Sequence, residues 1–309
     1  MKRKIKIALI GCGNWGKNIL RDLKKLNCEV IVVSESENSI QNAKEGKADN
    51  IFMNISELIN IDGVVVAVNT LSHYKVINEI LKIHSSIPIF SEKPLCVDVD
   101  QAFELYKKAS SNLFVMDKWR YHQGIIELTK FVKEQRFGNI KGIKLNRNGW
   151  GNPHKDVNCI WILLPHDLSI ILEILGYIPE AKYALYDKTR NGIQGMTGLL
   201  LDEKHWVSFE ISERYAGYKR EIIVYFDDGI IQLTNSNKDN IELFYTTKDY
   251  LIKKPNLQLI AFDNEMPLYR ELKSFTNYIK GIEGPPKSSA YDGYQIVKKI
   301  QDLIDIANN

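Results

Sequence analysis

The segment 7–20, IALIGCGNWGKNIL, constrains the fold more strongly than any other part of this 309-residue chain. A run of buried-type residues ends in Gly11, Gly13 and Gly16, and apolar residues then return at helical spacing. A dinucleotide-binding βαβ unit uses these glycines for a tight turn, for close approach of a pyrophosphate to the main chain, and for close packing of helix on strand. The alternative is a glycine-rich turn that binds no ligand.

The chain up to about residue 117 repeats one pattern, in which a short apolar run is followed by a turn and an amphipathic stretch. The runs at 63–68 and 87–90 are apolar without alternation, as expected of strands that are covered on both faces. The stretch 98–110 has helical spacing, with Asp98 as the expected N-cap. Strands that alternate with helices predict a parallel, doubly wound Rossmann sheet. The strands are expected at 4–10, 29–33, 51–53, 63–68, 87–91 and 113–116.

An acidic residue at the end of the second strand completes the dinucleotide fingerprint. The run VIVVSESE supplies Glu35, 19 residues after Gly16. A carboxylate there can accept hydrogen bonds from the ribose hydroxyls and would repel a 2′-phosphate, and no Arg or Lys follows immediately. The sequence therefore predicts NAD as the cofactor and disfavours NADP.

The pattern changes in the second half of the chain. The stretch 120–138 is expected to be a helix that ends near Gly138, and long extended runs follow it. Alternation is visible in HWVSFEIS, and DDG at 227–229 predicts a hairpin turn. These patterns predict an open, mainly antiparallel sheet with helices on one face, which makes this an α+β domain.

The length favours two domains rather than one. We expect a dinucleotide-binding Rossmann domain at 1–118 and a substrate-binding and oligomerisation domain at 119–309.

Charge and cysteine usage exclude several classes of protein. The net charge is only +3 and no basic stripe with interleaved aromatics is present, so no nucleic-acid partner is expected. No stretch approaches the roughly 18 apolar residues that would span a bilayer. The four cysteines contain no C-x-x-C pair and the histidines have no metal-ligand spacing, so neither a metal site nor a disulfide framework is predicted. A reducing, cytoplasmic compartment fits these features.

Beyond the glycines, the chain resembles the glucose-fructose oxidoreductase/inositol dehydrogenase (Gfo/Idh/MocA) family over nearly its entire length. SEKPLCVD at 91–98 is similar to the E-K-P-L motif of that family, and VAVNTLSHYKV at 66–76 is similar to its segment after the fourth strand, with Asn69 in place of the usual proline. The segments 266–279 and 288–300 are similar to its closing segments. The fingerprint and the resemblance imply cofactor contacts from Gly11, Cys12, Gly13, Asn14, Trp15, Gly16, Glu35, Asn69, His73, Glu92 and Lys93.

A narrower resemblance points to the branch of UDP-N-acetylglucosamine 3-dehydrogenase type. In that branch one segment commonly reads W-D-L-G-P-H-D, whereas here it reads W-I-L-L-P-H-D. His166 and Asp167 remain, but Ile162 stands where the acid would be and cannot transfer a proton. Either the enzyme operates with Lys93 and His166, with Asp156 or Asp167 supplying the charge, or the protein binds dinucleotide without turnover.

The family chemistry assigns roles to the remaining polar residues. Oxidation of a secondary alcohol needs a base within hydrogen-bond reach of the hydroxyl. The resemblance makes Lys93 the base or the polariser of the substrate oxygen and His166 the partner proton carrier. Arg120 either pairs with a diphosphate or is held by a nearby carboxylate. The expected substrate contacts are Arg120, Tyr121, Asp156, Asn158 and Asp167.

The sequence thus predicts an NAD-dependent dehydrogenase of a sugar secondary alcohol, with a nucleotide-linked, acetamido sugar favoured and surface-polysaccharide or antibiotic-sugar assembly as its setting. A ketosugar reductase, a non-catalytic dinucleotide-binding protein and an NAD-assisted bond-cleaving enzyme are the alternatives. In the resembled family the open sheet face builds oligomers, so a homo-dimer or homo-tetramer is expected.

Overall fold

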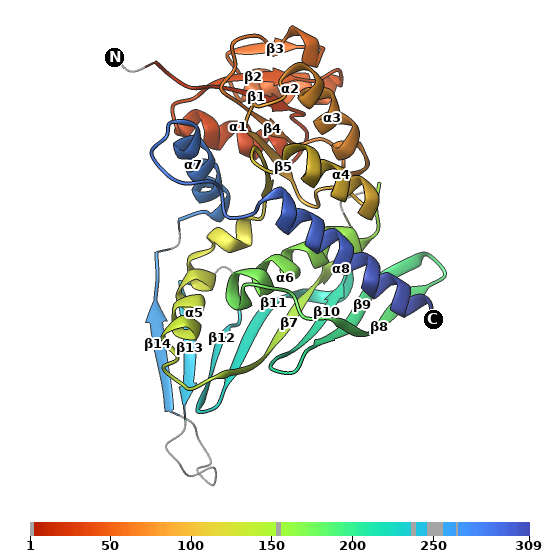
Figure 1. Cartoon of the computed structure of the whole chain (residues 1–309), viewed down its shortest axis with the longest axis vertical. Coiled ribbons are helices and arrows are strands. Elements are labelled where there is room, and N and C mark those ends of the chain that lie inside the picture. Colours follow the sequence, from red (N-terminus) through yellow and green to blue (C-terminus); the bar gives the residue numbers. More distant parts are fainter. Residues whose placement is uncertain (1–2, 153–155, 236–238, 246–255, 264) are drawn as a thin grey trace. The chain divides into compact units, whose positions relative to one another are not determined.

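A computed structural model describes residues 3–152, 156–235, 239–245, 256–263 and 265–309 (Figure 1). The chain divides into two compact units. The first unit comprises residues 1–118 and 266–297, and the second comprises residues 119–265 and 298–309.

The first unit is built on a six-stranded parallel sheet with the order β3-β2-β1-β4-β5-β6. The strand order reverses between β1 and β4, so the loops that follow these two strands flank the point at which doubly wound sheets bind ligands. The predicted Rossmann sheet is confirmed. Its strands are β1 (Lys6–Ile10), β2 (Glu29–Val33), β3 (Asn50–Phe52), β4 (Gly63–Val66), β5 (Ile89–Glu92) and β6 (Leu113–Met116).

The connections of this sheet are helices whose ends match the sequence signals. Asp98 accepts a hydrogen bond from the main-chain N–H of Gln101, as predicted for an N-cap. The Ser36 side chain caps the second helix in the same way, because it accepts from the main-chain N–H of Ser39. The helices are α1 (Gly16–Lys25), α2 (Glu37–Glu45), α3 (His73–Ile83) and α4 (Val99–Ala109), with short 3₁₀ turns η1 (Ile55–Glu57) and η2 (Thr70–Ser72).

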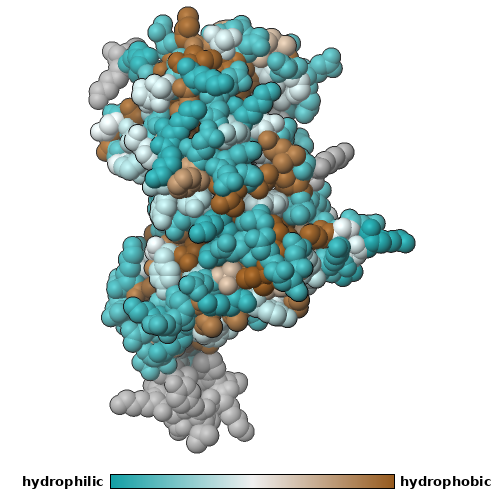
Figure 2. All heavy atoms as spheres, turned by 45° about the vertical axis from the view of Figure 1, so that its right-hand side comes forward, coloured by the Kyte–Doolittle hydropathy of each residue, from teal (hydrophilic) through white to brown (hydrophobic). Residues whose placement is uncertain are grey.

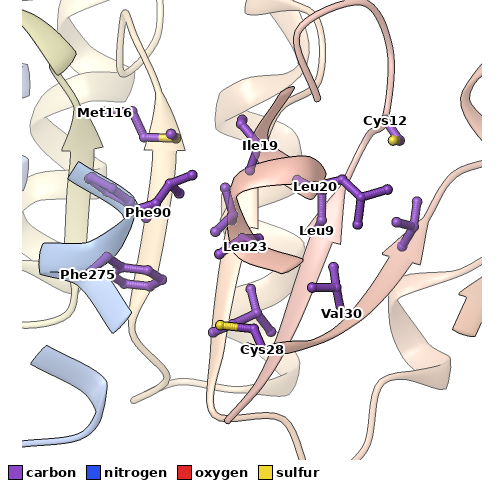
Figure 3. Close-up of a cluster of buried hydrophobic side chains, with 14 of the residues drawn as sticks. Leu9, Cys12, Ile19, Leu20, Leu23, Cys28, Val30, Phe90, Met116 and Phe275 are labelled. Carbon is purple, nitrogen blue, oxygen red and sulfur yellow. The ribbon is translucent and has the colours of Figure 1, made fainter. Parts of the chain in front are cut away.

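Helix α7 (Pro267–Ile279) returns to the first unit late in the chain and packs against α1. Leu268, Leu272 and Phe275 lie in the same buried cluster as the strands and α1, and the Phe275 ring stacks on Phe90 at 4.9 Å (Figure 3). The sequence predicts this helix in the second domain, 119–309, and not in the first. The physical reason for the difference is its apolar stripe, which is buried by the Rossmann core, and residues 266–297 accordingly belong to the first unit.

The second unit contains an eight-stranded sheet with the order β14-β13-β12-β11-β7-β10-β9-β8. All neighbours are antiparallel except β10 and β7, so the prediction of a mainly antiparallel sheet is confirmed. The DDG signal is a hairpin, because β11 ends at Phe226 and β12 begins at Gly229. The strands are β7 (Ile140–Trp150), β8 (Ala181–Thr189), β9 (Gly192–Leu201), β10 (Trp206–Ser212), β11 (Arg214–Phe226), β12 (Gly229–Leu233), β13 (Asn240–Tyr245) and β14 (Asn256–Ala261), the last of which was not predicted.

Helices α5 (Gln123–Glu134) and α6 (Cys159–Leu175) cover one face of this sheet. In Figure 1 both lie on the same side of the strands, α5 over β12 and β13 and α6 over β7, β9 and β10. Helix α5 ends before the predicted Gly138, because Gln135 already adopts a left-handed conformation with φ of 50°. Helix α6 continues through Pro165, so Ile162 and His166 are both helical. The last helix, α8 (Ala290–Asn308), contributes to both units.

No helix in the described part of the chain is long and apolar enough to cross a membrane. On the face that Figure 2 shows, hydrophobic residues form small groups between hydrophilic ones.

Replacing Phe275 with alanine tests the assignment of α7 to the Rossmann core. Phe275 is fully buried, so we expect a loss of about 3–5 kcal/mol in the free energy of unfolding. Urea unfolding followed by circular dichroism measures this loss. The control is Ile282→Ala, since Ile282 is 67% exposed and its truncation should change stability by less than about 0.5 kcal/mol. Equal, small effects of both substitutions would contradict the assignment.

Candidate active site

The three glycines after β1 differ in what surrounds them. A Cβ on Gly11, whose φ is +89°, would stand 2.6 Å from the carbonyl oxygen of Ala67, and one on Gly16 would stand 2.5 Å from that of Gly11. A Cβ on Gly13 would meet nothing within 4 Å. The fold therefore requires glycine at the first and third positions for its own packing, whereas Gly13 leaves open space beside bare main chain, as a bound pyrophosphate requires.

The glycine turn leads directly into the first turn of α1. This turn carries no acidic side chain, so the positive end of the helix dipole is available to a phosphate. The side-chain amide of Asn42 donates to the carbonyl oxygen of Cys12 at 2.8 Å and fixes the turn from α2. Burial raises the pKa of the Cys12 thiol to about 11, so this thiol is neutral at physiological pH. The predicted contacts at Gly11, Cys12, Gly13, Asn14, Trp15 and Gly16 all belong to the glycine turn or to the start of α1.

Glu35 lies at the same edge of the sheet. It is exposed and follows β2 by two residues, just as Cys12 follows β1 by two residues, and Ile10 pairs with Val33 in the parallel register. The carboxylate therefore stands at the carboxyl end of the strand next to the glycine turn, where a ribose hydroxyl can reach it. The residues present in this unit fit a nicotinamide dinucleotide.

His73 ties together the loops that follow β4 and β5. It is 1% exposed, and its Nδ1 and Nε2 lie 2.8 Å from the carbonyl oxygen of Pro94 and 3.3 Å from that of Val68. Asn69 precedes it and caps η2, its Oδ1 accepting from the main-chain N–H of Ser72 at 3.1 Å. Both side chains thus hold the main chain at the sheet edge.

Lys93 follows β5 directly and is half-buried beside a cis Lys93–Pro94 peptide. Its neighbour Glu92 accepts a hydrogen bond from the indole N–H of Trp15, and the Lys118 ammonium lies 4.4 Å from the centre of the Trp15 ring. Burial raises the pKa of Glu92, while the charges of Lys93 and Lys118 and the Trp15 hydrogen bond oppose that rise. The predicted residues Trp15, Glu92 and Lys93 are therefore brought together at the carboxyl edge of the sheet, with Lys118 as an additional member.

Glu271 on α7 belongs to the same group of charges and was not predicted from the sequence. It is 1% exposed, and neither carboxylate oxygen has a hydrogen-bond partner among the described residues. Burial raises its pKa well above the ordinary value, the charges of Glu92 and Asp117 raise it further, and Lys118 opposes the rise. A signal existed in the sequence, because Glu271 falls within the apolar stripe of α7.

In the second unit, His166 and Ile162 lie on one face of α6, four residues apart. His166 is half-buried, and its ring stands edge-on to that of Trp119 with centroids 6.5 Å apart. Ile162 is 8% exposed and makes this face of the helix apolar one turn before His166.

Asp167 does not share the surroundings of His166. Arg147 on β7 approaches the Asp167 Oδ1 with both Nε and Nη2 at 2.7 Å, and both side chains are buried. Burial raises the pKa of Asp167, while Arg147 and Arg220 oppose that rise. The Arg147 guanidinium also lies 4.5 Å from the centre of the Trp119 ring. Asp167, which was expected to bind substrate, thus joins α6 to the sheet through an interior ion pair.

Two of the other expected substrate residues, Arg120 and Asn158, contact opposite ends of α6. Arg120 donates from Nε to Glu173 at 2.9 Å, which is the alternative of an arginine held by a carboxylate. Asn158 caps α6 by accepting from the main-chain N–H of Ile160 at 3.0 Å. Tyr121 is buried in η3 (Lys118–Tyr121), and Asp156 is half-buried just before the cap. No cluster that could hold a metal ion occurs among the residues that the structure describes.

Residues 5–115 match the model of the Gfo/Idh/MocA family, described as an oxidoreductase family with an NAD-binding Rossmann fold. Over these residues the chain is similar to the Gfo/Idh/MocA oxidoreductase family. These residues accordingly form an NAD-binding Rossmann fold, and the predicted NAD cofactor is confirmed. No curated protein sequence matches the chain.

Solved structures extend the similarity of fold to nearly the whole chain. UDP-N-acetylglucosamine 3-dehydrogenase GnnA from Acidithiobacillus ferrooxidans is 17% identical with a TM-score of 0.83, and 98% of each chain is covered. Levoglucosan dehydrogenase with NADH and levoglucosan is 13% identical with a TM-score of 0.86, covering 99% of this chain and 98% of that one. An oxidoreductase from Agrobacterium radiobacter with NAD⁺, L-tartaric acid and magnesium is 15% identical with a TM-score of 0.85, covering 99% and 97%. At these identities the likeness shows the fold.

Replacing Gly13 with alanine should separate cofactor binding from folding. The added methyl group meets no protein atom, so stability should be unchanged or slightly increased, whereas the affinity for NAD should fall by about tenfold or more, or at least about 1.4 kcal/mol. Calorimetric titration with NAD and thermal unfolding measure the two effects. Gly16→Ala is the matched control and should lose stability, because its methyl group would meet the Gly11 carbonyl. Undiminished NAD affinity in Gly13→Ala would refute the placement of the pyrophosphate.

Replacing Glu271 with glutamine should stabilise the protein increasingly as the pH rises. The folded protein holds a proton on Glu271 that the unfolded chain releases above pH 4.5, so the wild-type free energy of unfolding falls with rising pH from that value up to the raised folded-state pKa. This free energy of unfolding falls by at most about 1.4 kcal/mol per pH unit. Glutamine has no proton to release, so the Glu271→Gln variant lacks this pH dependence.

Urea unfolding of both proteins at several pH values between about 5 and 8 measures the difference. Glu79→Gln, on the exposed side of α3, is the control and should run parallel to wild type. A constant difference between Glu271→Gln and wild type would rule out a buried proton.

Proposed function

We propose that the protein is an NAD-dependent oxidoreductase that moves a hydride between a sugar secondary alcohol and the nicotinamide. One observation carries this proposal: the open main chain at Gly13, the exposed Glu35 and the half-buried Lys93 gather at one edge of a parallel sheet. This edge is where doubly wound sheets bind ligands. A cofactor along it would have its phosphates at the glycines and would extend toward the lysine.

The reaction requires a proton acceptor and a hydride acceptor. Bound NAD supplies the hydride acceptor. Lys93 supplies an amine at the end of β5 that takes the hydroxyl proton or polarises the oxygen. The main chain beside it is held by the contact of His73 with the adjacent Pro94 carbonyl. We assign His166 as the second proton carrier, on the helix of the second unit. In the reverse direction these groups return the proton, which makes the protein a ketosugar reductase.

Ile162 and Asp167 narrow the set of catalytic groups. Ile162 has no proton to transfer, and the Asp167 carboxylate is engaged by Arg147 inside the second unit. The proposed chemistry therefore depends on Lys93 and His166. The alternative, a protein that binds NAD without turnover, follows from the same two positions and is decided by the assay below.

A nucleotide-linked acetamido sugar is our proposed substrate. A similar fold belongs to a UDP-N-acetylglucosamine 3-dehydrogenase, and another similar fold was crystallised with levoglucosan, so sugars are the ligand class these neighbours share. Surface-polysaccharide or antibiotic-sugar assembly is the proposed setting. The exposed Glu35, which no Arg or Lys follows directly, favours NAD over NADP.

Self-association through the open sheet face is also proposed. The Tyr186 hydroxyl donates to the Ile304 carbonyl oxygen of α8, so the neighbouring odd-numbered side chains of β8 point to the other face. There Tyr183 and Leu185 are 53% and 54% exposed. A dimer or tetramer would cover these side chains. All four cysteines are buried thiols, which suits the proposed cytoplasmic location.

Lys93→Met tests the function directly. The variant should bind NAD as wild type does, because a methionine side chain has similar volume, but turnover should fall by about 10²–10⁴-fold through loss of the proton acceptor. NADH formation is followed by absorbance with NAD and a panel of UDP-acetamido and free sugars, and the panel is repeated with NADP. Lys75→Met on the exposed side of α3 is the control.

The outcomes of this assay separate the alternatives. Normal turnover by Lys93→Met would refute the assigned role. Tight NAD binding without turnover of any sugar by wild type would support the non-catalytic alternative, and product without net NADH would support NAD-assisted bond cleavage.

A further inference from the structure

A small pocket of about 20 Å³ lies at the amino-terminal end of α6 in the second unit. This volume corresponds to roughly one water-sized group. Three segments of the unit meet there: the turn after β7, the first turn of α6, and the junction of β10 and β11. The lining residues are Gly151, Asn152, Cys159, Ile162, Leu163 and Glu213.

Glu213 is rigidly mounted in this pocket. Its main-chain N–H donates to the carbonyl oxygen of Gln194 at 2.9 Å, and its carbonyl oxygen accepts from the N–H of Gly151 at 2.7 Å. The backbone is therefore held from both sides at the point where β10 passes into β11. A fixed main chain limits the region that the carboxylate can reach, which suits a group that recognises a ligand.

The Glu213 carboxylate has unused capacity as a hydrogen-bond acceptor. The Asn152 side chain donates to it, while its Oε2 is buried and has no hydrogen-bond partner among the described residues. Burial raises the pKa of Glu213, and the Asn152 hydrogen bond opposes that rise. A buried acceptor without a donor is costly, and a donor of water-sized dimensions in the pocket would remove the cost.

Among the residues that the structure describes, the other walls of the pocket do not supply that donor in ionised form. Ile162 and Leu163 are aliphatic, and burial raises the pKa of the Cys159 thiol to about 12, so this thiol stays neutral. The pocket thus combines one strong acceptor with a mainly apolar wall. Such a wall admits a single small polar group and excludes a charged or bulky one.

The pocket also stands close to the proposed catalytic histidine. Ile162, which lines it, is four residues before His166 on the same face of α6, a spacing that brings the two Cβ atoms to within about 6 Å. A ligand group bound at Glu213 therefore lies about one helical turn from the imidazole.

We propose that Glu213 is a specificity-determining residue that accepts a hydrogen bond from one hydroxyl group of a carbohydrate substrate, with Ile162 and Leu163 limiting the pocket to that group. This inference rests on the proposed function in one respect, that the carbohydrate is the ligand on which His166 acts. The hydroxyl that Glu213 holds is distinct from the one that is oxidised.

Binding, measured separately from turnover, tests this role. Calorimetric titration in the presence of NAD uses UDP-N-acetylglucosamine, UDP-glucose, glucose and levoglucosan as probes. For the probe that binds best, Glu213→Gln should weaken affinity by about 10- to 100-fold, because an amide replaces a charged acceptor at constant volume. Glu203→Gln, which makes the same charge change at an exposed position of the β9–β10 turn, should bind as wild type does.

Monodeoxy analogues of that probe provide the second measurement. Removal of one hydroxyl group should weaken binding to wild type by a similar factor. The same removal should not weaken binding to Glu213→Gln any further. A purely structural role of Glu213 would not produce this coupling. The comparison among analogues also runs in wild type alone, where a lack of any affinity loss at every deoxy position would contradict the proposal even if Glu213→Gln fails to fold.

Three results would overturn the proposal: wild-type affinity in Glu213→Gln, no deoxy position coupled to Glu213, or no binding of any probe to wild type. Failure of the proposed function has a different signature. In that case a probe binds in a Glu213-dependent way, yet no NADH forms.

Discussion

At Gly11 and Gly16 the main chain comes very close to neighbouring carbonyl oxygens. A Cβ would stand 2.6 Å from such an oxygen at Gly11 and 2.5 Å at Gly16, so a side chain is excluded at both positions. This contact locks the turn after β1 against the end of β4 and fixes the start of α1. The parallel strands place Glu35, Asn69 and Lys93 at the same edge as this turn. The open space at Gly13 then has a defined position relative to each of them.

The structure handles its buried carboxylates in three different ways. Asp167 is compensated by Arg147 in a nearly solvent-free ion pair, so it serves the packing of α6. Glu271 has no hydrogen-bond partner among the described residues and is stabilised in its protonated form by burial and by the charges of Glu92 and Asp117. Glu213 is half satisfied by Asn152 and opens onto a pocket. Burial raises the pKa in all three, but only the surroundings tell a structural carboxylate from one that can receive a ligand.

Hydrophobic periodicity and turn chemistry predicted most of the fold. Apolar runs and the Asp98 cap located the Rossmann elements, and the DDG signal located a hairpin, because these signals act within a few residues. The position of α7 could not be predicted in this way, since an apolar stripe shows that a helix is buried but not which core buries it. Strand β14 was missed for a related reason: most of its residues are exposed, so it lacks the alternation of a half-buried strand.

The candidate site, like the fold, could be predicted from the sequence only in part. The glycine turn and Glu35 were identified from spacing alone, whereas the direction of individual side chains was not. His166 and Asp167 are adjacent in sequence, but successive residues of a helix point about 100° apart, so one neighbours Trp119 edge-on while the other is buried against Arg147. Arg120 and Asn158 similarly found partners within the protein that no motif specifies.

The return of the chain to its first unit at residue 266 has a consequence for biosynthesis. When the first 118 residues leave the ribosome, the apolar surface around Phe90 that α7 will cover has no partner, and residues 119–265 of the second unit are synthesised before that partner exists. A nascent Rossmann half with an uncovered core is the kind of species that chaperones bind. Completion of the nucleotide-binding half is thereby postponed until translation is almost finished.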